Sequence, residues 1–282
     1  MKLQVSDALN DEERQIFLSY IANSFGEKKE APPSSFVALW QKWMEKSGEE
    51  EGAQDILNRH LLSKRPVSFI EPRHVRMETY RSFAGDVPLL LFERDEDFEQ
   101  FVVNAAYRGE APPDIHQMGA SFLFNAKVLL IALSRKPYSN VPAAEMGLSD
   151  EEWRMRSQIL RREHECTHLY TRRFYGTARN NLHDELMADF FGIMAAMGRY
   201  EAQWFLRFMG IGREEGGRLS LYTRDLPDNV KRAVAETAST AAAFLEQWSQ
   251  SAAFGAMSRE EQVDYLCRIG IAGMCGNTQG SA

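Results

Sequence analysis

Cysteine is scarce in this sequence, with three residues among 282. Cys166, Cys267 and Cys275 are too few and too scattered to form a disulfide framework for a chain of this length, which indicates a reducing compartment. Long apolar runs are missing as well. No segment has the length needed to span a bilayer, and Met1–Asn10 lacks the apolar core of a signal peptide. We therefore expect a cytoplasmic protein without a membrane partner.

Positive charge is in the minority, because 33 Lys and Arg stand against 40 Asp and Glu, for a formal net charge of -7. Such a chain has no overall attraction to phosphate backbones or anionic lipid, so we expect no nucleic-acid partner. A local basic patch remains an alternative where arginines gather. We interpret them as a solvated helix face paired with neighbouring glutamates: Arg161, Arg162, Arg172 and Arg173.

Helical periodicity dominates both ends of the chain, and strand-like runs fill the part between them. Apolar spacing predicts helices over residues 7–25, 36–46, 53–62, 95–107, 149–176, 181–198, 200–209, 229–249 and 258–269. Runs of β-branched and aromatic residues predict strands over residues 67–70, 75–80, 87–92 and 122–133. The predicted fold class is therefore α+β, with a small mixed sheet and mostly helical N- and C-terminal parts.

The strongest local pattern is His164-Glu165-Cys166-Thr167-His168, within the helix predicted at 149–176. Histidines four residues apart lie one turn apart on the same helix face, so both imidazoles can reach one metal ion. Glu165 stands beside the first histidine, where it can take a proton from a metal-bound water without being a ligand. Cys166 is expected to be a small buried residue. The alternative is an ordinary hydrogen-bonded helix face.

A second pair of side chains at helical spacing lies on the next predicted helix, where Glu185 and Asp189 are one turn apart. Zinc hydrolase sites commonly use three protein ligands and one open position, so Glu185 is the predicted third ligand beside His164 and His168. Asp189 is predicted to accept the other ring N–H of a ligand histidine. Apolar neighbours make idle buried carboxylates costly, which favours this interpretation over two solvated acids. His183, the rival third ligand, points elsewhere on the helix.

The two motifs resemble those of the gluzincin group of metallopeptidases, in which HExxH on one helix is followed by ExxxD on the next, as in thermolysin-like enzymes. The resemblance covers only His164–Asp189. It implies a Zn²⁺ ion held by His164, His168 and Glu185, with Glu165 as catalytic base and Asp189 as the hydrogen-bond partner of a ligand histidine. It also implies a zincin-like fold whose small mixed sheet packs on the active-site helix. Glu185 follows His168 by 17 positions, which is shorter than in thermolysin-like enzymes and indicates a minimal form.

Weaker features agree with the resemblance. Gluzincins usually carry an edge strand that pairs with an extended substrate and often contains Asn-Ala, and Asn125-Ala126 lies in an apolar run upstream. An ordinary strand is the alternative. Related enzymes also place a phenol or imidazole near the metal to stabilise the oxyanion, for which Tyr175, His183 and Tyr222 are candidates. A packed core side chain is the alternative for each of the three.

The sequence thus predicts a zinc-dependent metallopeptidase that hydrolyses a peptide bond in a peptide or protein substrate. We expect a helical N-terminal extension at 1–65 and a zincin-like catalytic domain at 66–282, with the sheet at 66–136, the metal helices at 149–198 and a helical part at 199–272. Two alternatives stay open. In the first, the protein hydrolyses a non-peptide amide. In the second, it is a zincin scaffold, metal-bearing or degenerate, that binds another protein.

Overall fold

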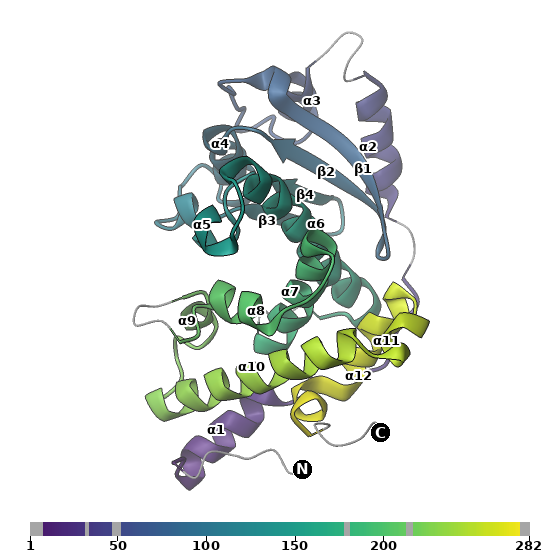
Figure 1. Cartoon of the computed structure of the whole chain (residues 1–282). Helices are drawn as coiled ribbons and strands as arrows, with labels where there is room; N and C mark the ends of the chain where they lie inside the picture. Colours follow the sequence, from purple (N-terminus) through teal and green to yellow (C-terminus); the bar gives the residue numbers. More distant parts are fainter. Residues whose placement is uncertain (1–7, 32–33, 47–51, 178–180, 213–216, 277–282) are drawn as a thin grey trace. The chain divides into compact units, whose positions relative to one another are not determined.

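The computed structural model describes residues 8–31, 34–46, 52–177, 181–212 and 217–276 (Figure 1). Internal contacts divide the chain into two compact units. One is the continuous stretch Ala31–Cys166, and the other combines Met1–Glu30 with Thr167–Ala282. The boundary falls inside one helix, α6 (Asp150–Tyr175). The expected division into an extension at 1–65 and a catalytic domain at 66–282 stays a prediction.

Within the described residues, a four-stranded mixed sheet organises the unit 31–166, which confirms the α+β class. Its strands are β1 (Val75–Ser82), β2 (Gly85–Phe92), β3 (Ala120–Phe124) and β4 (Leu129–Leu133), in the order β1-β2-β4-β3. β2 pairs antiparallel with β1 and parallel with β4, and β4 pairs antiparallel with β3. The inner strands carry the buried apolar runs 87–92 and 129–133, as strands covered on both faces require.

The predicted strand at residues 67–70 is wrong, because the structure assigns no strand there. Backbone N–H groups in this segment donate to side chains at 2.6 to 2.7 Å, from Val67 to Asn58, from Phe69 to Gln54 and from Ile70 to Asp97. Since side chains already satisfy these donors, the segment needs no neighbouring strand. The side chains of Val67 and Phe69 are buried, although the segment does not join the sheet.

The single strand predicted over 122–133 is a hairpin of β3 and β4, so Asn125 and Ala126 do not lie in an edge strand. β3 is an edge strand, but it ends at Phe124. The side-chain oxygen of Asn125 accepts the backbone N–H groups of Lys127 and Val128 at 2.8 and 3.0 Å. Asparagine commonly closes turns by such bonds to its own backbone two or three residues on. The sequence signal that suggested a substrate strand is therefore a turn signal.

The same unit also contains helices. They are α2 (Ser35–Lys46), α3 (Ala53–His60), α4 (Asp95–Ala106), α5 (Ala143–Met146) and the first part of α6, together with the short 3₁₀ helices η1 (Pro72–His74), η2 (Ile115–Gln117) and η3 (Tyr138–Asn140). α2 contacts β1 and β2, and α4 contacts β2, β3 and β4. Trp40 anchors α2 by burying its ring and donating its indole N–H to the Glu78 carbonyl at 2.8 Å.

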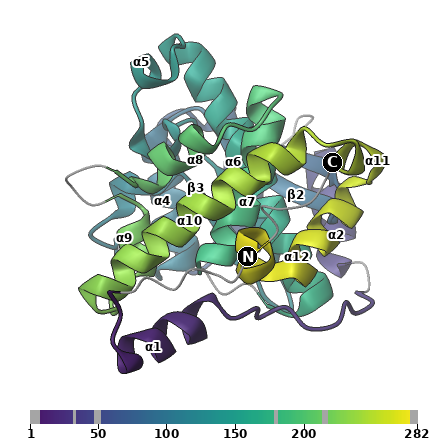
Figure 2. The same cartoon turned by 60° about the horizontal axis from the view of Figure 1, so that its bottom comes forward.

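The other unit is helical. It contains α1 (Asp11–Ile21), the end of α6, α7 (Leu182–Met197), α8 (Ala202–Met209), α9 (Leu219–Tyr222), α10 (Asp228–Ser249), α11 (Ala252–Ala256) and α12 (Arg259–Gly276). α10 contacts α1, α7, α8, α11 and α12, and Figure 2 shows it running across this unit. α7 is apolar enough to be buried along most of its length, as a central helix requires.

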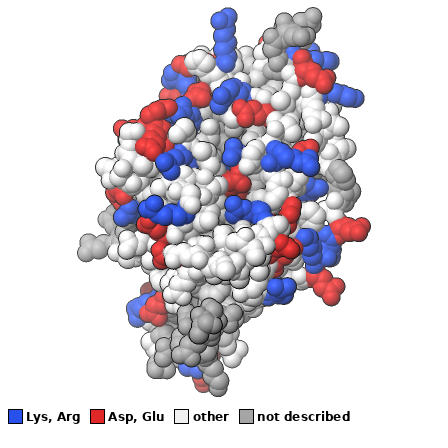
Figure 3. Space-filling view, turned by 45° about the vertical axis from the view of Figure 1, so that its right-hand side comes forward, with Lys and Arg blue, Asp and Glu red and all other residues white. Residues whose placement is uncertain are grey.

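Two observations bear on the expectation that the protein has neither a membrane nor a nucleic-acid partner. In the described part of the chain, no helix is both long enough and apolar enough to cross a membrane. On the face shown in Figure 3, Lys and Arg side chains alternate with Asp and Glu side chains, and no extended area of one sign is visible. The absence of a nucleic-acid partner stays a prediction.

We expected Arg161 to lie on a solvated helix face, and it does not. Its side chain is buried, and its guanidinium donates to the carbonyls of Lys136 and Pro137 at 2.5 and 3.0 Å. Gly119 makes room for it, because a Cβ at that position would overlap the guanidinium. Arg162, in contrast, forms the predicted pair with a glutamate, Glu163, at 3.0 Å. Arg161 therefore ties α6 to the segment after β4 and contributes nothing to a basic patch.

Candidate metal centre

His164 and His168 on α6 and Glu185 on α7 form a group that could hold a metal ion. Each offers one ligand atom, and these three atoms lie within 4.8 Å of one another. All three side chains are buried, at 7%, 6% and 3% exposure. Within the described ranges this is the one group of at least three His, Cys, Asp or Glu side chains arranged in this way. The structure thus brings together the three ligands that the sequence predicts.

The local sequence explains why these side chains converge. α6 is an unbroken helix from Asp150 to Tyr175, so its two histidines project from consecutive turns. α7 begins after Asn181, whose side chain accepts the backbone N–H of Asp184 as an N-cap. That cap fixes the first turn of α7, where Glu185 lies. An acidic side chain is also favoured there by the positive end of the helix dipole.

His168 lies between two carboxylates. Its Nε2 atom is 3.5 Å from Glu185 Oε1, and its Nδ1 atom is 3.8 Å from Asp184 Oδ1. Burial by itself lowers the pKa of His168, but the adjacent carboxylates of Asp184 and Glu185 outweigh burial and hold the pKa well above 6.5. In the metal-free protein, His168 therefore carries a proton that a metal ion would have to displace. Sequence reasoning missed Asp184, although its position directly before Glu185 is a signal.

His164 is oriented by Tyr138. The phenol oxygen of Tyr138 lies 3.0 Å from His164 Nδ1, and both side chains are buried. Tyr138 is itself fixed, because its backbone N–H donates to the Ser157 hydroxyl at 2.9 Å. Because Nδ1 contacts Tyr138, Nε2 is the ring nitrogen that we expect to bind a metal ion. Nothing in the sequence pointed to Tyr138, which lies 26 positions before the histidine.

Glu185 and Asp189 share a cationic partner that was not predicted. Arg218 Nη2 is 3.3 Å from Glu185 Oε2 and 2.5 Å from Asp189 Oδ2. Both carboxylates are nearly inaccessible to solvent, so the guanidinium neutralises charges that would be costly alone. Tyr222 adds a hydrogen bond to Glu185, and the pKa of its phenol is raised, chiefly by burial. The predicted bond from Asp189 to a ligand histidine stays a prediction.

A close approach of two glycines positions Arg218. Gly210 ends α8 with φ at +73°, a conformation that side chains rarely adopt. A Cβ on Gly210 would overlap the backbone of Gly217, and a Cβ on Gly217 would overlap Gly210. Only glycine at both positions allows this contact, which places Arg218 directly before α9.

Glu165 is half-buried beside the ligand group. Within the described residues its carboxylate has no hydrogen-bond or ion-pair partner, in contrast to Asp184, Glu185 and Asp189. A carboxylate without such a partner is able to accept a proton without first breaking a bond. Cys166, the next residue, is completely buried, as predicted, and burial raises the pKa of its thiol.

The three oxyanion candidates differ in their surroundings. Tyr175 donates its hydroxyl to Asp264 at 2.9 Å. His183 is buried, donates Nε2–H to the Leu266 carbonyl at 3.2 Å, and has its pKa lowered to about 4 by burial. Of the three, Tyr222 is the one bonded to a ligand candidate, Glu185. A catalytic role for any of them stays a prediction.

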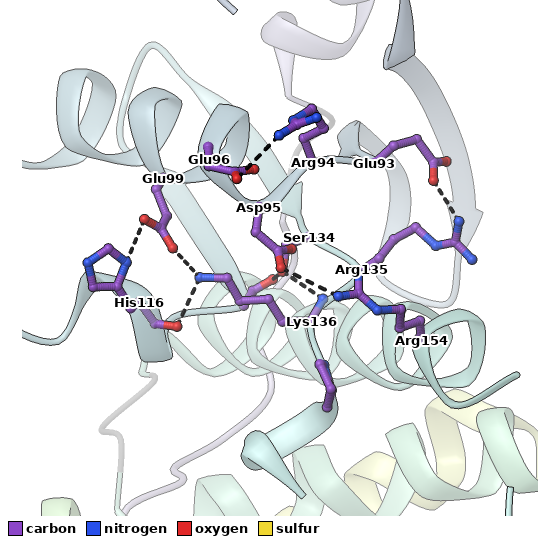
Figure 4. Close-up of polar contacts among 12 residues, drawn as sticks. Glu93, Arg94, Asp95, Glu96, Glu99, His116, Ser134, Arg135, Lys136 and Arg154 are labelled. Atoms are coloured by element: carbon purple, nitrogen blue, oxygen red, sulfur yellow. Dashed lines mark hydrogen bonds and ion pairs between the residues drawn. The ribbon is translucent and has the colours of Figure 1, made fainter. Parts of the chain in front are cut away.

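A second polar cluster lies in the unit 31–166, at the carboxyl ends of the parallel strands β2 and β4 (Figure 4). Lys136 Nζ donates to Glu99 at 2.6 Å and to the His116 carbonyl at 3.0 Å, and His116 Nδ1 lies 2.8 Å from Glu99. Burial raises the pKa of Glu99, but the bonds from Lys136 and His116 lower it by more, so the pKa lies below its usual value. Its charged members pair with one another, so we interpret this cluster as structural.

The architecture and the site together define an α+β protein with a buried cluster of two histidines and one glutamate. A family model described as "Family of unknown function (DUF7005)" matches residues 123–275, which is more than half of the chain. The chain therefore belongs to this family, and the matched range contains the three ligand candidates, Glu165 and Arg218. Comparison with curated proteins and with solved structures finds no match. The function must accordingly be argued from the site.

Proposed function

We propose that this protein is a zinc-dependent metallohydrolase, and specifically a metallopeptidase of a minimal gluzincin type. The observation that carries the proposal is the buried group of His164, His168 and Glu185, with ligand atoms within 4.8 Å of one another. Two imidazoles and one carboxylate are the ligand set of many catalytic zinc sites, which keep a further position open for water or substrate.

The surroundings of the group fit a metal ion with nitrogen and oxygen ligands. Imidazole ligands favour zinc over calcium or magnesium, which prefer oxygen ligands alone. Three buried carboxylates, Asp184, Glu185 and Asp189, lie on α7, and the single guanidinium of Arg218 pairs with two of them, so a metal ion at Glu185 would add positive charge where negative charge is in excess. A bound zinc ion would supply a Lewis acid and a water molecule of lowered pKa.

Residues of the chain supply the remaining parts of the chemistry. Glu165 accepts the proton of the attacking water and passes it to the leaving amine, so no covalent intermediate is required. Tyr138 orients the ring of His164, and the carboxylate of Asp184 lies 3.8 Å from Nδ1 of His168, on the side of the ring away from Glu185. Tyr222 is our preferred oxyanion candidate, because its partner is the ligand candidate Glu185, whereas Tyr175 and His183 bond to Asp264 and the Leu266 carbonyl.

The proposed substrate is a peptide or a protein. Two features favour a peptide over a non-peptide amide. The His164–Asp189 motifs resemble those of metallopeptidases, and β3 is an edge strand, to which an extended peptide could pair. Cytoplasmic residence and a zincin-like arrangement of the sheet and α6 belong to the same proposal.

Replacing Glu165 by Gln tests the proposal, with Glu236→Gln as the matched control. Glu236 is an exposed glutamate on α10, outside the ion pairs of the described residues. We expect the Glu165 variant to keep its zinc and lose at least about a hundredfold in turnover of a peptide library, and the control to match the parent. Equal turnover in both variants would refute the role of Glu165. A zinc-loaded parent that cleaves no peptide but hydrolyses small amides would redirect the proposal to the non-peptide alternative.

A further inference from the structure

A pocket of about 320 Å³ lies in the unit 31–166, formed by the segment after α3, the end of α4 and the hairpin of β3 and β4. One wall is apolar and consists of Leu61, Leu62, Ala105, Leu123 and Val128. None of these residues belongs to the proposed metal centre. A cavity of this size is in the range that proteins use for small molecules.

The polar side of the pocket is cationic. Lys64 and Arg65 line it, together with Asn104 and Asn125, and no acidic residue does so. Within the described residues, neither Lys64 nor Arg65 makes an ion pair or a side-chain hydrogen bond. Lys136, a cation of the same unit, is in contrast paired with Glu99. Two uncompensated cations in a chain of net charge -7 favour an anionic ligand.

The segment that carries the two cations is held in place by several bonds. The backbone N–H of Arg65 donates to the Leu62 carbonyl at 2.8 Å, and the side-chain amide of Asn104 donates to the carbonyls of Arg65 and Pro66 at 3.3 and 3.1 Å. The side chain of Arg65 lies against Gly109, whose φ of +92° is a conformation that glycine adopts readily and other residues rarely do. The guanidinium is thus partly oriented before any ligand arrives, which lowers the entropic cost of binding.

Asn125 adds a neutral donor. Its side-chain oxygen accepts the backbone N–H groups of the turn, which does not use its amide N–H groups, and Asn125 is a lining residue of the pocket. We propose that this pocket binds a carboxylate carried on an apolar body, with Arg65 and Lys64 on the carboxylate and the leucine-rich wall on the apolar body. A guanidinium fork matches a carboxylate in a bidentate manner, and the leucine side chains exclude water from the rest of the ligand.

Two sources offer this chemistry, a free carboxylic acid and the C-terminus of a peptide that ends in an apolar residue. Hexanoate and N-acetyl-Ala-Leu represent them, and acetate, hexylamine and inorganic phosphate are the controls. Each is titrated into the full-length, ¹⁵N-labelled protein while amide resonances are followed. We expect saturable shifts at residues 61–65 and 123–128 for at least one of the two probes, with about tenfold weaker binding of acetate and none of hexylamine.

Variants separate the site from a general charge effect. Lys64→Ala together with Arg65→Ala should weaken binding at least about tenfold, whereas Lys42→Ala with Arg73→Ala, which removes two exposed cations elsewhere in the unit, should leave it unchanged. All four positions are exposed, so folding is expected to persist. Absence of local shifts with both probes up to about 10 mM, or equal weakening in both double variants, would overturn the proposal. Phosphate binding as tightly as hexanoate would also overturn it, because the apolar wall would then serve no purpose.

Discussion

Replacing Arg218 by Met should destabilise the metal-free protein far more than the zinc-loaded protein. The guanidinium is the nearby cation of two buried carboxylates, Glu185 and Asp189, and its own side chain is 17% exposed. Removing one partner of a buried ion pair costs roughly 3 to 5 kcal/mol, and the lower end applies because His168 and Tyr222 also contact Glu185. A bound zinc ion supplies replacement positive charge at Glu185, so the loss should shrink to about 1 kcal/mol once zinc is present.

Urea unfolding of parent and variant, with a chelator and with excess zinc, measures both losses. Arg224→Met is the matched control, since Arg224 is exposed in the same region and should change stability by less than about 0.5 kcal/mol. A loss below about 1 kcal/mol without zinc would show that Arg218 does not neutralise these carboxylates. Equal losses with and without zinc would show that the metal ion does not bind at Glu185.

Two further predictions concern pH. The raised pKa of His168 means that the metal-free folded state holds a proton more tightly than the unfolded state does, so its contribution to stability is full below about pH 6.5 and is lost as pH rises through the folded pKa. Zinc must displace that proton, so apparent zinc affinity, measured by competition with a chromophoric chelator, should rise about tenfold per pH unit below the pKa, with a shallower slope in Asp184→Asn. A pH-independent affinity would contradict the assignment. Burial lowers the pKa of His183 to about 4, so the unfolded chain takes up a proton that the folded state resists, and about 3 kcal/mol of stability should be lost as pH falls from about 6.5 to 4. Urea unfolding of His183→Gln should show a smaller loss over the same range, and an equal loss would refute this prediction.

The sequence predicts those features that depend on local periodicity. The helices that carry His164, His168 and Glu185 were placed to within a residue or two at each end, because apolar spacing and terminal signals agree there. The inner strands β2 and β4 were also recognisable as apolar runs. The hairpin turn at Asn125 was missed because β3 and β4 are both apolar, so the run shows no change in hydrophobicity where the chain reverses.

The partners of the ligand candidates could not be predicted in the same way. Tyr138 precedes His164 by 26 positions, and Arg218 follows Glu185 by 33, so neither contact has a local pattern. Arg218 depends on the glycine contact between residues 210 and 217, which only a three-dimensional structure reveals. Long-range polar contacts of this kind are specified by packing rather than by spacing along the chain. Asp184 is the exception, since it lies next to Glu185 and is the acidic residue nearest to His168 Nδ1 among the contacts observed.

The central claim is that His164, His168 and Glu185 bind zinc, and elemental analysis of the purified protein tests it most directly. We expect about one zinc per chain in the parent, and in His74→Ala, which removes an exposed histidine elsewhere. The double variant His164→Ala, His168→Ala should contain none, while circular dichroism verifies that it remains helical. A parent that stays free of metal after incubation with zinc, or a double variant that retains it, would contradict the claim.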